Sequence, residues 1–194
     1  MAYLLIEKMQ FILASASPRR KELLSYILTS FDVVPSQAEE EVNISLFPEQ
    51  MACSLAERKC DAVFKENRQK TVIGCDTIVV YNGEILGKPK NRDDAVQTLK
   101  KLSGKTHLVM TGVCVQNKFK KLVNYEVTEV KFNILTDEFI ERYVNGGSPM
   151  DKAGSYGIQD EGVVKEYFGS FTNVVGLPVT LTKKMIEEVL NSDE

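Results

Sequence analysis

Short apolar runs and amphipathic segments follow one another along the chain, and this alternation restricts what it can fold into. Phe11–Ala14 has the length and composition of a buried strand. Ser17 and Pro18 then provide an N-cap and a proline at the first helical position, which predicts a helix to about Tyr26. The same signals predict strands at Phe31–Val34 and Thr71–Tyr81, and helices from Pro48, over Arg92–Leu102, from Thr136 to Gly146 and after Pro178. Such a chain is expected to form a mixed, twisted α/β sheet flanked by helices.

A tight hairpin is inserted into this alternation. Asn82-Gly83 follows a long apolar strand and is typical of a type I′ turn. A two-residue loop places the last residue of that strand opposite Glu84. The same pairing, continued along both strands, places Thr77 opposite Lys88. Asp76 is then expected close to Lys88.

Length and composition favour one cytoplasmic domain. A chain of 194 residues with 43% hydrophobic content can bury a full core and lies near the upper end of the single-domain range. Lys and Arg number 24 against 27 Asp and Glu, and the net charge of -3 argues against an extended basic face for nucleic acid. We find no signal peptide and no transmembrane helix in the sequence.

The cysteines and the single histidine offer little chemistry. Cys53, Cys60, Cys75 and Cys114 lie in apolar segments without a Cys-x-x-Cys spacing, as reduced core cysteines do, which favours a reducing compartment. Cys53 and Cys60 share a predicted helix, so a metal site is an alternative, although no histidine accompanies them. We expect His107 to be a half-exposed strand residue without a catalytic role.

An unusual pair of cations opens the first predicted helix. Ser15-Ala-Ser-Pro-Arg-Arg20 follows a buried strand and places Arg19 and Arg20 in the first turn, where cations oppose the helix dipole. Free backbone N–H groups, serine hydroxyls and guanidinium groups together suit an anion such as a phosphate chain. The alternative is a solvated arginine pair, which costs about 0.3–1 kcal/mol. The segment lacks the glycines and the Gly-Lys-Ser/Thr of a P-loop.

Two charged residues interrupt apolar segments. Asp76 lies within a strand, where a carboxylate without a partner would cost several kcal/mol. It is either half of a structural ion pair with Lys88 or a general base or metal ligand. Lys59 lies on the apolar face of the helix from Pro48, and taken alone such a lysine usually extends its amine to solvent. The face is formed by Ala52, Leu55, Lys59 and Val63.

Polar loops supply further candidates. Glu39-Glu-Glu41 is typical of a solvated loop, but with Asp76 it could supply the hard oxygen ligands that Mg²⁺ prefers. Asp151–Gln159 has neither helical nor strand periodicity and contains two glycines, which is typical of a loop at a site. Within it, Lys152 and Gln159 serve either solubility or substrate recognition.

In their order along the chain, these segments resemble the Maf family of nucleotide pyrophosphatases from Met9 almost to the C-terminus. The resemblance implies an N-terminal extension over residues 1–8 and a single catalytic domain over residues 9–194, with two lobes around a deep cleft as in inosine-triphosphate pyrophosphatases. Cys60 departs from the pattern, since alanine often follows the lysine. The motifs that carry the resemblance are Ser15-Ala-Ser-Pro-Arg-Arg20, Glu40, Glu57-Arg-Lys59, Gly74-Cys-Asp-Thr77, Gly87-Lys-Pro89, Asp151-Lys-Ala-Gly154, Tyr156-Gly-Ile-Gln159 and Val175-Gly-Leu-Pro178.

The resemblance implies hydrolysis of a nucleoside triphosphate to the monophosphate and pyrophosphate, with Mg²⁺ or Mn²⁺, by a homodimer. Arg19, Thr77 and Gln159 together resemble the branch that acts on dTTP and UTP, and modified pyrimidine nucleotides are further candidate substrates. Two alternatives stay open. One is a purine-directed pyrophosphatase of the inosine-triphosphate type, and the other is a regulator of septum formation or division arrest that binds nucleotide with negligible turnover.

The roles of single residues also follow from the resemblance. Asp76 is expected to accept a proton from water, and Gln159 can offer both a donor and an acceptor to a pyrimidine edge. Positioned cations and an in-line water are what phosphoryl chemistry demands. The phosphate ligands are expected to be Ser15, Arg19, Arg20, Lys59 and Lys88, the further substrate contacts Thr77, Lys152 and Gln159, and the metal ligands Glu40 and Asp76.

Overall fold

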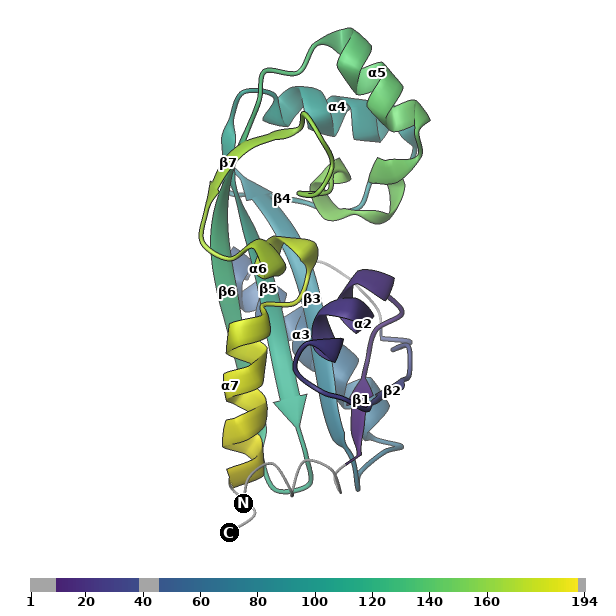
Figure 1. The fold of residues 1–194 in the computed structure, drawn as a ribbon, viewed down its shortest axis with the longest axis vertical. Coiled ribbons are helices and arrows are strands. Elements are labelled where there is room, and N and C mark those ends of the chain that lie inside the picture. Colours follow the sequence, from purple (N-terminus) through teal and green to yellow (C-terminus); the bar gives the residue numbers. More distant parts are fainter. Residues whose placement is uncertain (1–9, 39–45, 192–194) are drawn as a thin grey trace. The chain divides into compact units, whose positions relative to one another are not determined.

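The computed structural model describes residues 10–38 and 46–191, and Figure 1 shows the elements in order. The predicted extension over residues 1–8 and the run Glu39–Glu41 lie outside the described residues. The strands are β1 (Phe11–Leu13), β2 (Asp32–Val33), β3 (Thr71–Tyr81), β4 (Glu84–Leu86), β5 (Thr106–Gln116), β6 (Lys121–Phe132) and β7 (Val164–Phe168). The helices are α2 (Pro18–Ser25), α3 (Pro48–Phe64), α4 (Arg92–Leu102), α5 (Asp137–Asn145), α6 (Phe171–Val175) and α7 (Val179–Leu190), with short 3-10 helices η1 (Ser148–Asp151) and η2 (Ala153–Ser155).

The strands form one mixed sheet, which confirms the predicted architecture. Six of them follow the order β2-β1-β3-β5-β6-β7, and β4 pairs with β3 outside this path. β1 is parallel to both of its neighbours, β2 and β3. β4 is antiparallel to β3, and β7 is antiparallel to β6.

Local sequence signals explain where several elements begin and turn. Ser17 caps α2, and its side chain accepts a hydrogen bond from the backbone N–H of Arg20. Asn82 and Gly83 have φ values of 50° and 79°, as a type I′ turn requires, and the turn places Tyr81 opposite Glu84. The predicted hairpin is therefore confirmed at its turn.

The chain divides into two compact units. Unit 1 contains the described residues up to Asp76, together with Thr111–Glu126 and the described residues from Gly176 onward. Unit 2 contains Thr77–Met110 and Val127–Val175. β3, β5 and β6 each contribute residues to both units.

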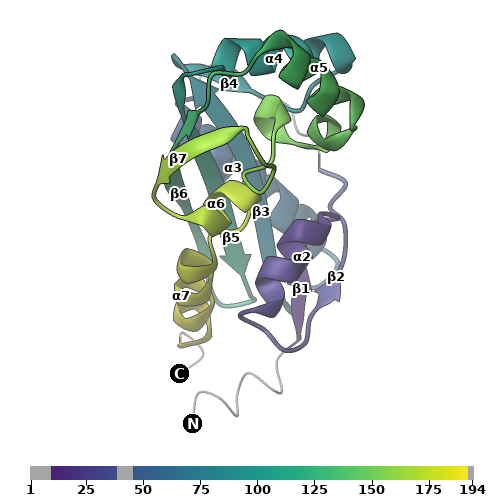
Figure 2. The same ribbon diagram turned by 45° about the horizontal axis from the view of Figure 1, so that its top comes forward.

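Each unit has its own hydrophobic core. In unit 1, side chains of α3 pack against β1, β3 and β5, and the buried cluster consists of Ile12, Ala14, Ala56, Cys60, Val63, Val72 and Cys114. In unit 2, α4 and α5 lie side by side in both views (Figures 1 and 2) and pack on the strands. Its largest fully buried side chains are Leu99, Leu102, Phe132 and Ile140.

The cysteines are free thiols, and three of the four are buried. Burial raises the pKa of the Cys75 thiol, so this sulfur stays protonated at neutral pH. The Cys60 thiol has a raised pKa because of a hydrogen bond with Cys114 and burial. Within residues 10–38 and 46–191, no helix is long and apolar enough to cross a membrane.

Candidate functional site

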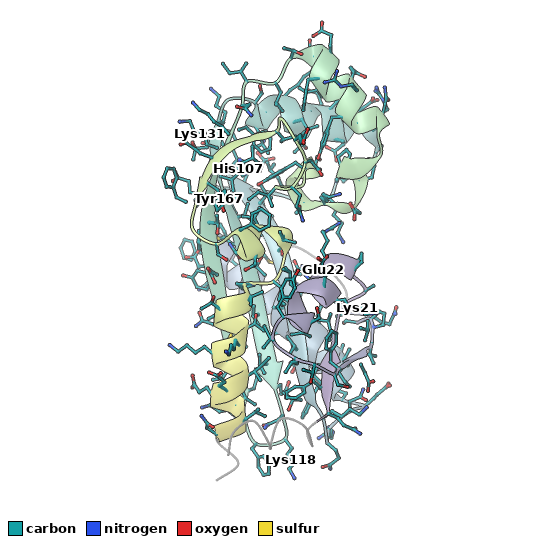
Figure 3. All side chains as sticks on the ribbon, in the orientation of Figure 1. Lys21, Glu22, His107, Lys118, Lys131 and Tyr167 are labelled. Carbon is teal, nitrogen blue, oxygen red and sulfur yellow. The ribbon has the colours of Figure 1, made fainter. Side chains whose placement is uncertain are left out.

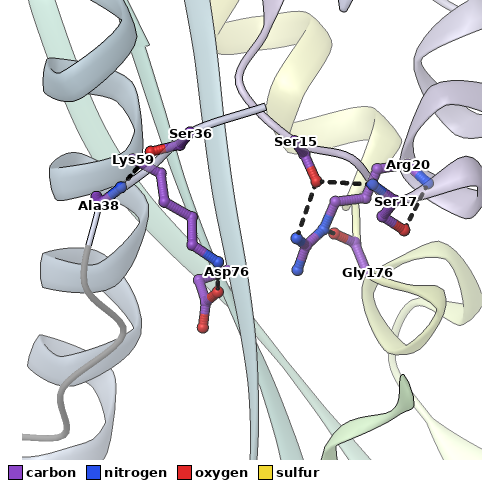
Figure 4. A network of polar contacts seen from close by, with 8 residues as sticks. All are labelled: Ser15, Ser17, Arg20, Ser36, Ala38, Lys59, Asp76 and Gly176. Atoms are coloured by element: carbon purple, nitrogen blue, oxygen red, sulfur yellow. Dashed lines mark hydrogen bonds and ion pairs between the residues drawn. The ribbon is translucent and has the colours of Figure 1, made fainter. Parts of the chain in front are cut away.

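The loop between β1 and α2 collects the first set of predicted site residues (Figure 4). Ser15 Oγ accepts hydrogen bonds from the backbone N–H of Ser17 at 3.2 Å and from the Arg20 guanidinium at 3.3 Å. The first turn of α2 contains no acidic residue, so Arg19 and Arg20 stand at its positive end as predicted. The arrangement leaves a cationic, donor-rich helix start of the kind that binds phosphate.

A backbone carbonyl from far along the chain orients Arg20. The Nε atom of Arg20 donates to the carbonyl oxygen of Gly176 at 2.9 Å. Ser15 and Gly176 thus fix two sides of the guanidinium group and restrict its rotamers. The sequence did not predict this role of Gly176, because the Val175-Gly-Leu-Pro178 motif gives no indication of a partner 156 positions away.

Lys59 and Asp76 form an ion pair within unit 1. The Lys59 ammonium contacts Asp76 Oδ1, and the two side chains are 10% and 13% exposed. Figure 4 shows this pair in the same close view as Ser15 and Arg20. Breaking such a buried pair by removing one partner typically costs about 3–5 kcal/mol. The lysine on the apolar face of α3 therefore points to Asp76 and not to solvent.

Two glycines bring α3 close enough to the sheet for this contact. A Cβ atom on Gly74 of β3 would lie 2.5 Å from the Ala56 carbonyl oxygen and 2.7 Å from the Cys60 nitrogen. A Cβ atom on Gly112 of β5 would lie 2.1 Å from the Ala52 carbonyl oxygen. Both contacts are with helix backbone, which cannot move aside as a side chain can. Glycine is thus required where α3 crosses β3 and β5.

The parallel register of β1 and β3 explains why Ser15 and Asp76 lie at the same level, just beyond the carboxyl end of β1. Phe11 pairs with Thr71 and Leu13 with Ile73. Continued by two residues, this register sets Ser15 level with the residue directly before Asp76. Ligands of open α/β sheets bind outside the carboxyl ends of parallel strands, and both side chains lie at that end of β1.

Unit 2 contains the second set of predicted site residues. The backbone N–H of Gly154 donates to the Gly87 carbonyl at 3.0 Å and joins the Asp151–Ser155 segment to the end of β4, next to Lys88. The Lys152 ammonium lies 2.9 Å from Asp151 Oδ1. Lys88 and Gln159 are exposed, while Thr77 is half-buried.

The predicted pairing of Thr77 with Lys88 is wrong, because the ladder ends earlier. Its last pair is Val79 with Leu86. The carbonyl of Gly87 bonds instead to Gly154, and Pro89 has no N–H with which to continue the ladder. Asp76 accordingly has Lys59 of α3 as its ion-pair partner, where the sequence suggested Lys88.

His107 is not the half-exposed residue that the sequence suggests. The residue, labelled in Figure 3, is 2% exposed. Its Nε2 lies 2.8 Å from the hydroxyl of Tyr156. The His107 and Tyr156 rings meet the Phe132 ring edge-on, with centroids 4.9 and 4.6 Å away. Burial lowers the pKa of His107 to about 4, so the imidazole is neutral at physiological pH.

Of the two residues that the sequence predicts as metal ligands, the structure describes only Asp76. No group of three His, Cys, Asp or Glu side chains within the described residues could hold a metal ion, and Glu40 is outside these ranges. Mg²⁺ usually keeps several waters and takes only one or two carboxylates in addition to substrate phosphates. The hard carboxylate oxygens of Asp76 therefore fit the donor chemistry that such an ion requires.

Solved structures define the class of fold. The Staphylococcus aureus Ham1 protein superimposes with a TM-score of 0.56, covering 92% of this chain and 98% of that one at 13% sequence identity. A HAM1 protein from Coxiella burnetii gives a TM-score of 0.50, covering 93% and 99% at 12% identity. The protein therefore has the α/β fold of the Ham1 structures.

Sequence comparison identifies the family. The Maf-like protein family matches residues 10–189, and the chain belongs to this family. A dTTP/UTP pyrophosphatase of Bacillus pumilus is 48% identical over 180 residues, which are 92% of this chain and 95% of the relative. Proteins with the same name from Aquifex aeolicus and Thermococcus kodakarensis are 46% and 45% identical, covering 93% and 91% of this chain and 96% and 95% of the relatives. The resemblance to the Maf family is confirmed.

Proposed function

We propose that the protein hydrolyses dTTP and UTP between the α- and β-phosphates and releases the nucleoside monophosphate and pyrophosphate. The observation that carries the proposal is the buried Lys59–Asp76 pair, because it joins a carboxylate to a cation in the same compact unit as the cationic start of α2. Three relatives at 45–48% identity are named dTTP/UTP pyrophosphatase, which supports the pyrimidine substrates. Related modified pyrimidine nucleotides are further candidates.

The proposal assigns the phosphate chain to the cationic residues. Its charge is balanced by the Arg19 and Arg20 guanidinium groups and by the Lys59 and Lys88 ammonium groups, with Ser15 as a hydroxyl ligand. We assign Thr77, Lys152 and Gln159 to further contacts with the nucleotide. Gln159 can both donate to and accept from the edge of a pyrimidine base.

Asp76 acts as the proton acceptor in the proposed reaction. The oxygen of a water molecule attacks the α-phosphorus, and the bond from this phosphorus to the α,β-bridging oxygen breaks. Pyrophosphate leaves with the bridging oxygen, and the proton of the water passes to the Asp76 carboxylate. Atoms and charges balance without an additional reactant.

Lys59 has two partners in this proposal. In the free enzyme its ammonium contacts the Asp76 carboxylate within an apolar strand. A triphosphate brings more negative charge than one carboxylate and competes for the same ammonium group. Transfer of Lys59 to phosphate would leave Asp76 able to accept a proton and would place the cation where the leaving charge develops.

Asp76 and Glu40 are the residues that we propose for a divalent cation. When bound, Mg²⁺ or Mn²⁺ would neutralise phosphate charge and orient the phosphate oxygens. The resemblance to the family also supports a cytoplasmic homodimer. Light scattering of the purified protein and cell fractionation test these two features.

Pyrophosphate release from a panel of pyrimidine and purine triphosphates, with Mg²⁺ or Mn²⁺, tests the reaction. Turnover is expected for dTTP and UTP above the others, and Asp76→Asn should lower it at least about 100-fold because the amide cannot accept the proton. Asp32→Asn is the matched control: Asp32 is 62% exposed and pairs with Lys70 on the surface. The control variant should keep its turnover.

The alternatives give different results on the same panel. A preference for purine triphosphates would favour a pyrophosphatase of the inosine-triphosphate type and contradict the assignment of Gln159. Nucleotide binding without turnover, unchanged in Asp76→Asn, would favour the regulator. Circular dichroism and urea denaturation of Asp76→Asn show whether its loss of turnover reflects damage to the fold, because removing one partner of the buried pair typically costs about 3–5 kcal/mol.

A further inference from the structure

Gln159 lies at the tip of a tight turn whose two ends are held. The backbone N–H of Asp160 donates to the Gly157 carbonyl at 3.1 Å, which closes the turn. Gln159 is exposed, whereas Gly157 is buried and Asp160 is half-buried. The neighbouring Tyr156 is 5% exposed and bonded to His107. The turn therefore presents one polar side chain from a fixed base.

Three groups form a closed set of hydrogen bonds at this base. The Tyr143 hydroxyl of α5 donates a hydrogen bond to Asp160 Oδ2. The backbone N–H of Gly157 points at both groups, 3.1 Å from Asp160 Oδ2 and 3.2 Å from the Tyr143 oxygen. We name Tyr143, Gly157 and Asp160 the turn clamp.

The clamp leaves no room for a side chain at Gly157. A Cβ atom there would lie 2.8 Å from Asp160 Oδ2 and 3.1 Å from Asp160 Cγ. The carboxylate is thus packed directly on the backbone of the turn. Tyr143 is itself restricted, since its ring stacks on Phe139 at a centroid distance of 6.1 Å and an interplanar angle of 12°.

We propose that Tyr143 and Asp160 are positioning residues that set the selectivity of the protein by holding the Gln159 turn. This inference rests on the proposed function, because it needs Gln159 to contact the base. A free turn would lose conformational entropy on binding and would let the amide adjust to several bases. A held turn keeps the donor and the acceptor of the Gln159 amide in fixed positions. A base with a different hydrogen-bonding edge then leaves polar groups unpaired when it binds.

The test compares Tyr143→Phe with the wild-type protein. The variant keeps the stacked ring and removes only the hydroxyl group. KM for dTTP should rise about fivefold, and the ratio of kcat/KM for dTTP to that for a purine triphosphate should fall by a similar factor, while kcat changes less than about twofold. Tyr125→Phe, at an exposed tyrosine of β6, is the matched control and should change neither quantity.

Asp160 provides a graded pair of variants. Asp160→Ala removes the acceptor and should reproduce the effect of Tyr143→Phe. Asp160→Asn keeps an oxygen that can accept from both Tyr143 and Gly157, so it should restore most of the selectivity. Hydrogen exchange of the Gly157 amide measures the stability of the clamp independently of enzyme activity. The protection of this amide should fall at least about tenfold in Tyr143→Phe.

A double substitution separates positioning from general loosening of the fold. In a Gln159→Ala background the selectivity is already lost, so adding Tyr143→Phe should not lower it further. The selectivity for pyrimidines could fall in Gln159→Ala but persist in Tyr143→Phe. This result would overturn the role of the clamp and would leave the proposed function intact. Absence of turnover in the wild-type protein would instead reject the proposed function, and unchanged Gly157 exchange in Tyr143→Phe would reject the clamp by itself.

Discussion

His107 makes the stability of the protein depend on pH although it lies in a hydrophobic core. Its pKa is lowered from 6.5 to about 4 by burial, so the folded state binds a proton only in more acidic solution than the unfolded state does. The stabilising contribution is complete above about pH 6.5. It is lost as the pH falls towards 4, by about 1.4 kcal/mol per unit and by about 3 kcal/mol in all.

Urea denaturation between pH 7 and pH 4.5 measures this loss, and His107→Gln is the comparison because it cannot titrate. The chain contains one histidine, so no other imidazole contributes to the slope. The free energy of unfolding of the wild-type protein should fall more steeply with decreasing pH than that of the variant. Equal slopes would show that the folded protein protonates His107 as readily as the unfolded chain does.

The sequence identifies charged residues in apolar surroundings, but it does not identify their partners. Asp76 is anomalous in a strand and Lys59 is anomalous on an apolar helix face, and the sequence around either residue alone leaves a structural and a functional role open. Their pairing depends on how α3 lies across β3, which no local pattern specifies. For the same reason Tyr143 is indistinguishable from any helical tyrosine until its hydroxyl is seen beside Asp160.

At the scale of elements, the position of α3 depends on two glycines in the strands beneath it. Gly74→Ala places a Cβ atom against the backbone of Ala56 and Cys60 and should displace the helix. The free energy of unfolding should decrease by about 1–3 kcal/mol. Turnover of dTTP should fall as well, because Lys59 precedes Cys60 on the displaced helix.

The comparison for this substitution is Gly87→Ala, where an added Cβ atom would meet no atom within 4 Å. Urea denaturation should give this control the wild-type stability. If Gly74→Ala were as stable as Gly87→Ala, the helix would not be in close contact with β3, and the account of the Lys59–Asp76 pair would need revision.

Element boundaries are predicted well where the determining signals are local. Ser17 and Pro18 begin α2, Asn82-Gly83 turns the hairpin, and Thr136 caps α5 through a hydrogen bond with the Phe139 N–H. The end of the β3–β4 ladder is different. It is decided by Gly154, which takes the carbonyl of Gly87 from a distant part of the chain. The prediction from sequence periodicity extends the ladder to Thr77, because periodicity gives no sign that Gly154 takes the hydrogen bond of the Gly87 carbonyl.

At the scale of the whole molecule, we expect the two units to unfold together. Neither is a continuous stretch of chain, and β3, β5 and β6 each supply hydrogen-bonded residues to both. Loss of the strands in one unit therefore removes pairing from the other, and a single cooperative transition follows.

The chain contains no tryptophan, so a separate probe can be placed in each unit. Tyr26→Trp reports on unit 1 and Tyr167→Trp on unit 2, and both positions are exposed. Urea midpoints from the two fluorescence signals should coincide with each other and with the midpoint from circular dichroism. Two separated midpoints would show that one unit is stable without the other.

The fold class and the family could be predicted because both depend on many residues at once. Alternation of elements specifies the mixed sheet, and an ordered series of short motifs specifies the family. The sequence could not predict how the site residues divide between the two units, because Asp76 and Thr77 are adjacent in sequence yet belong to different units. Charge and hydrophobicity do not mark that boundary.

The hydrogen bond from Arg20 to the carbonyl of Gly176 has a consequence for folding during translation. The serine and arginine residues that are proposed to bind phosphate are synthesised before this carbonyl, which lies 156 positions further along the chain than Arg20. A nascent chain can therefore form α2 before Gly176 is translated, but the Arg20 side chain gains its carbonyl partner only afterwards.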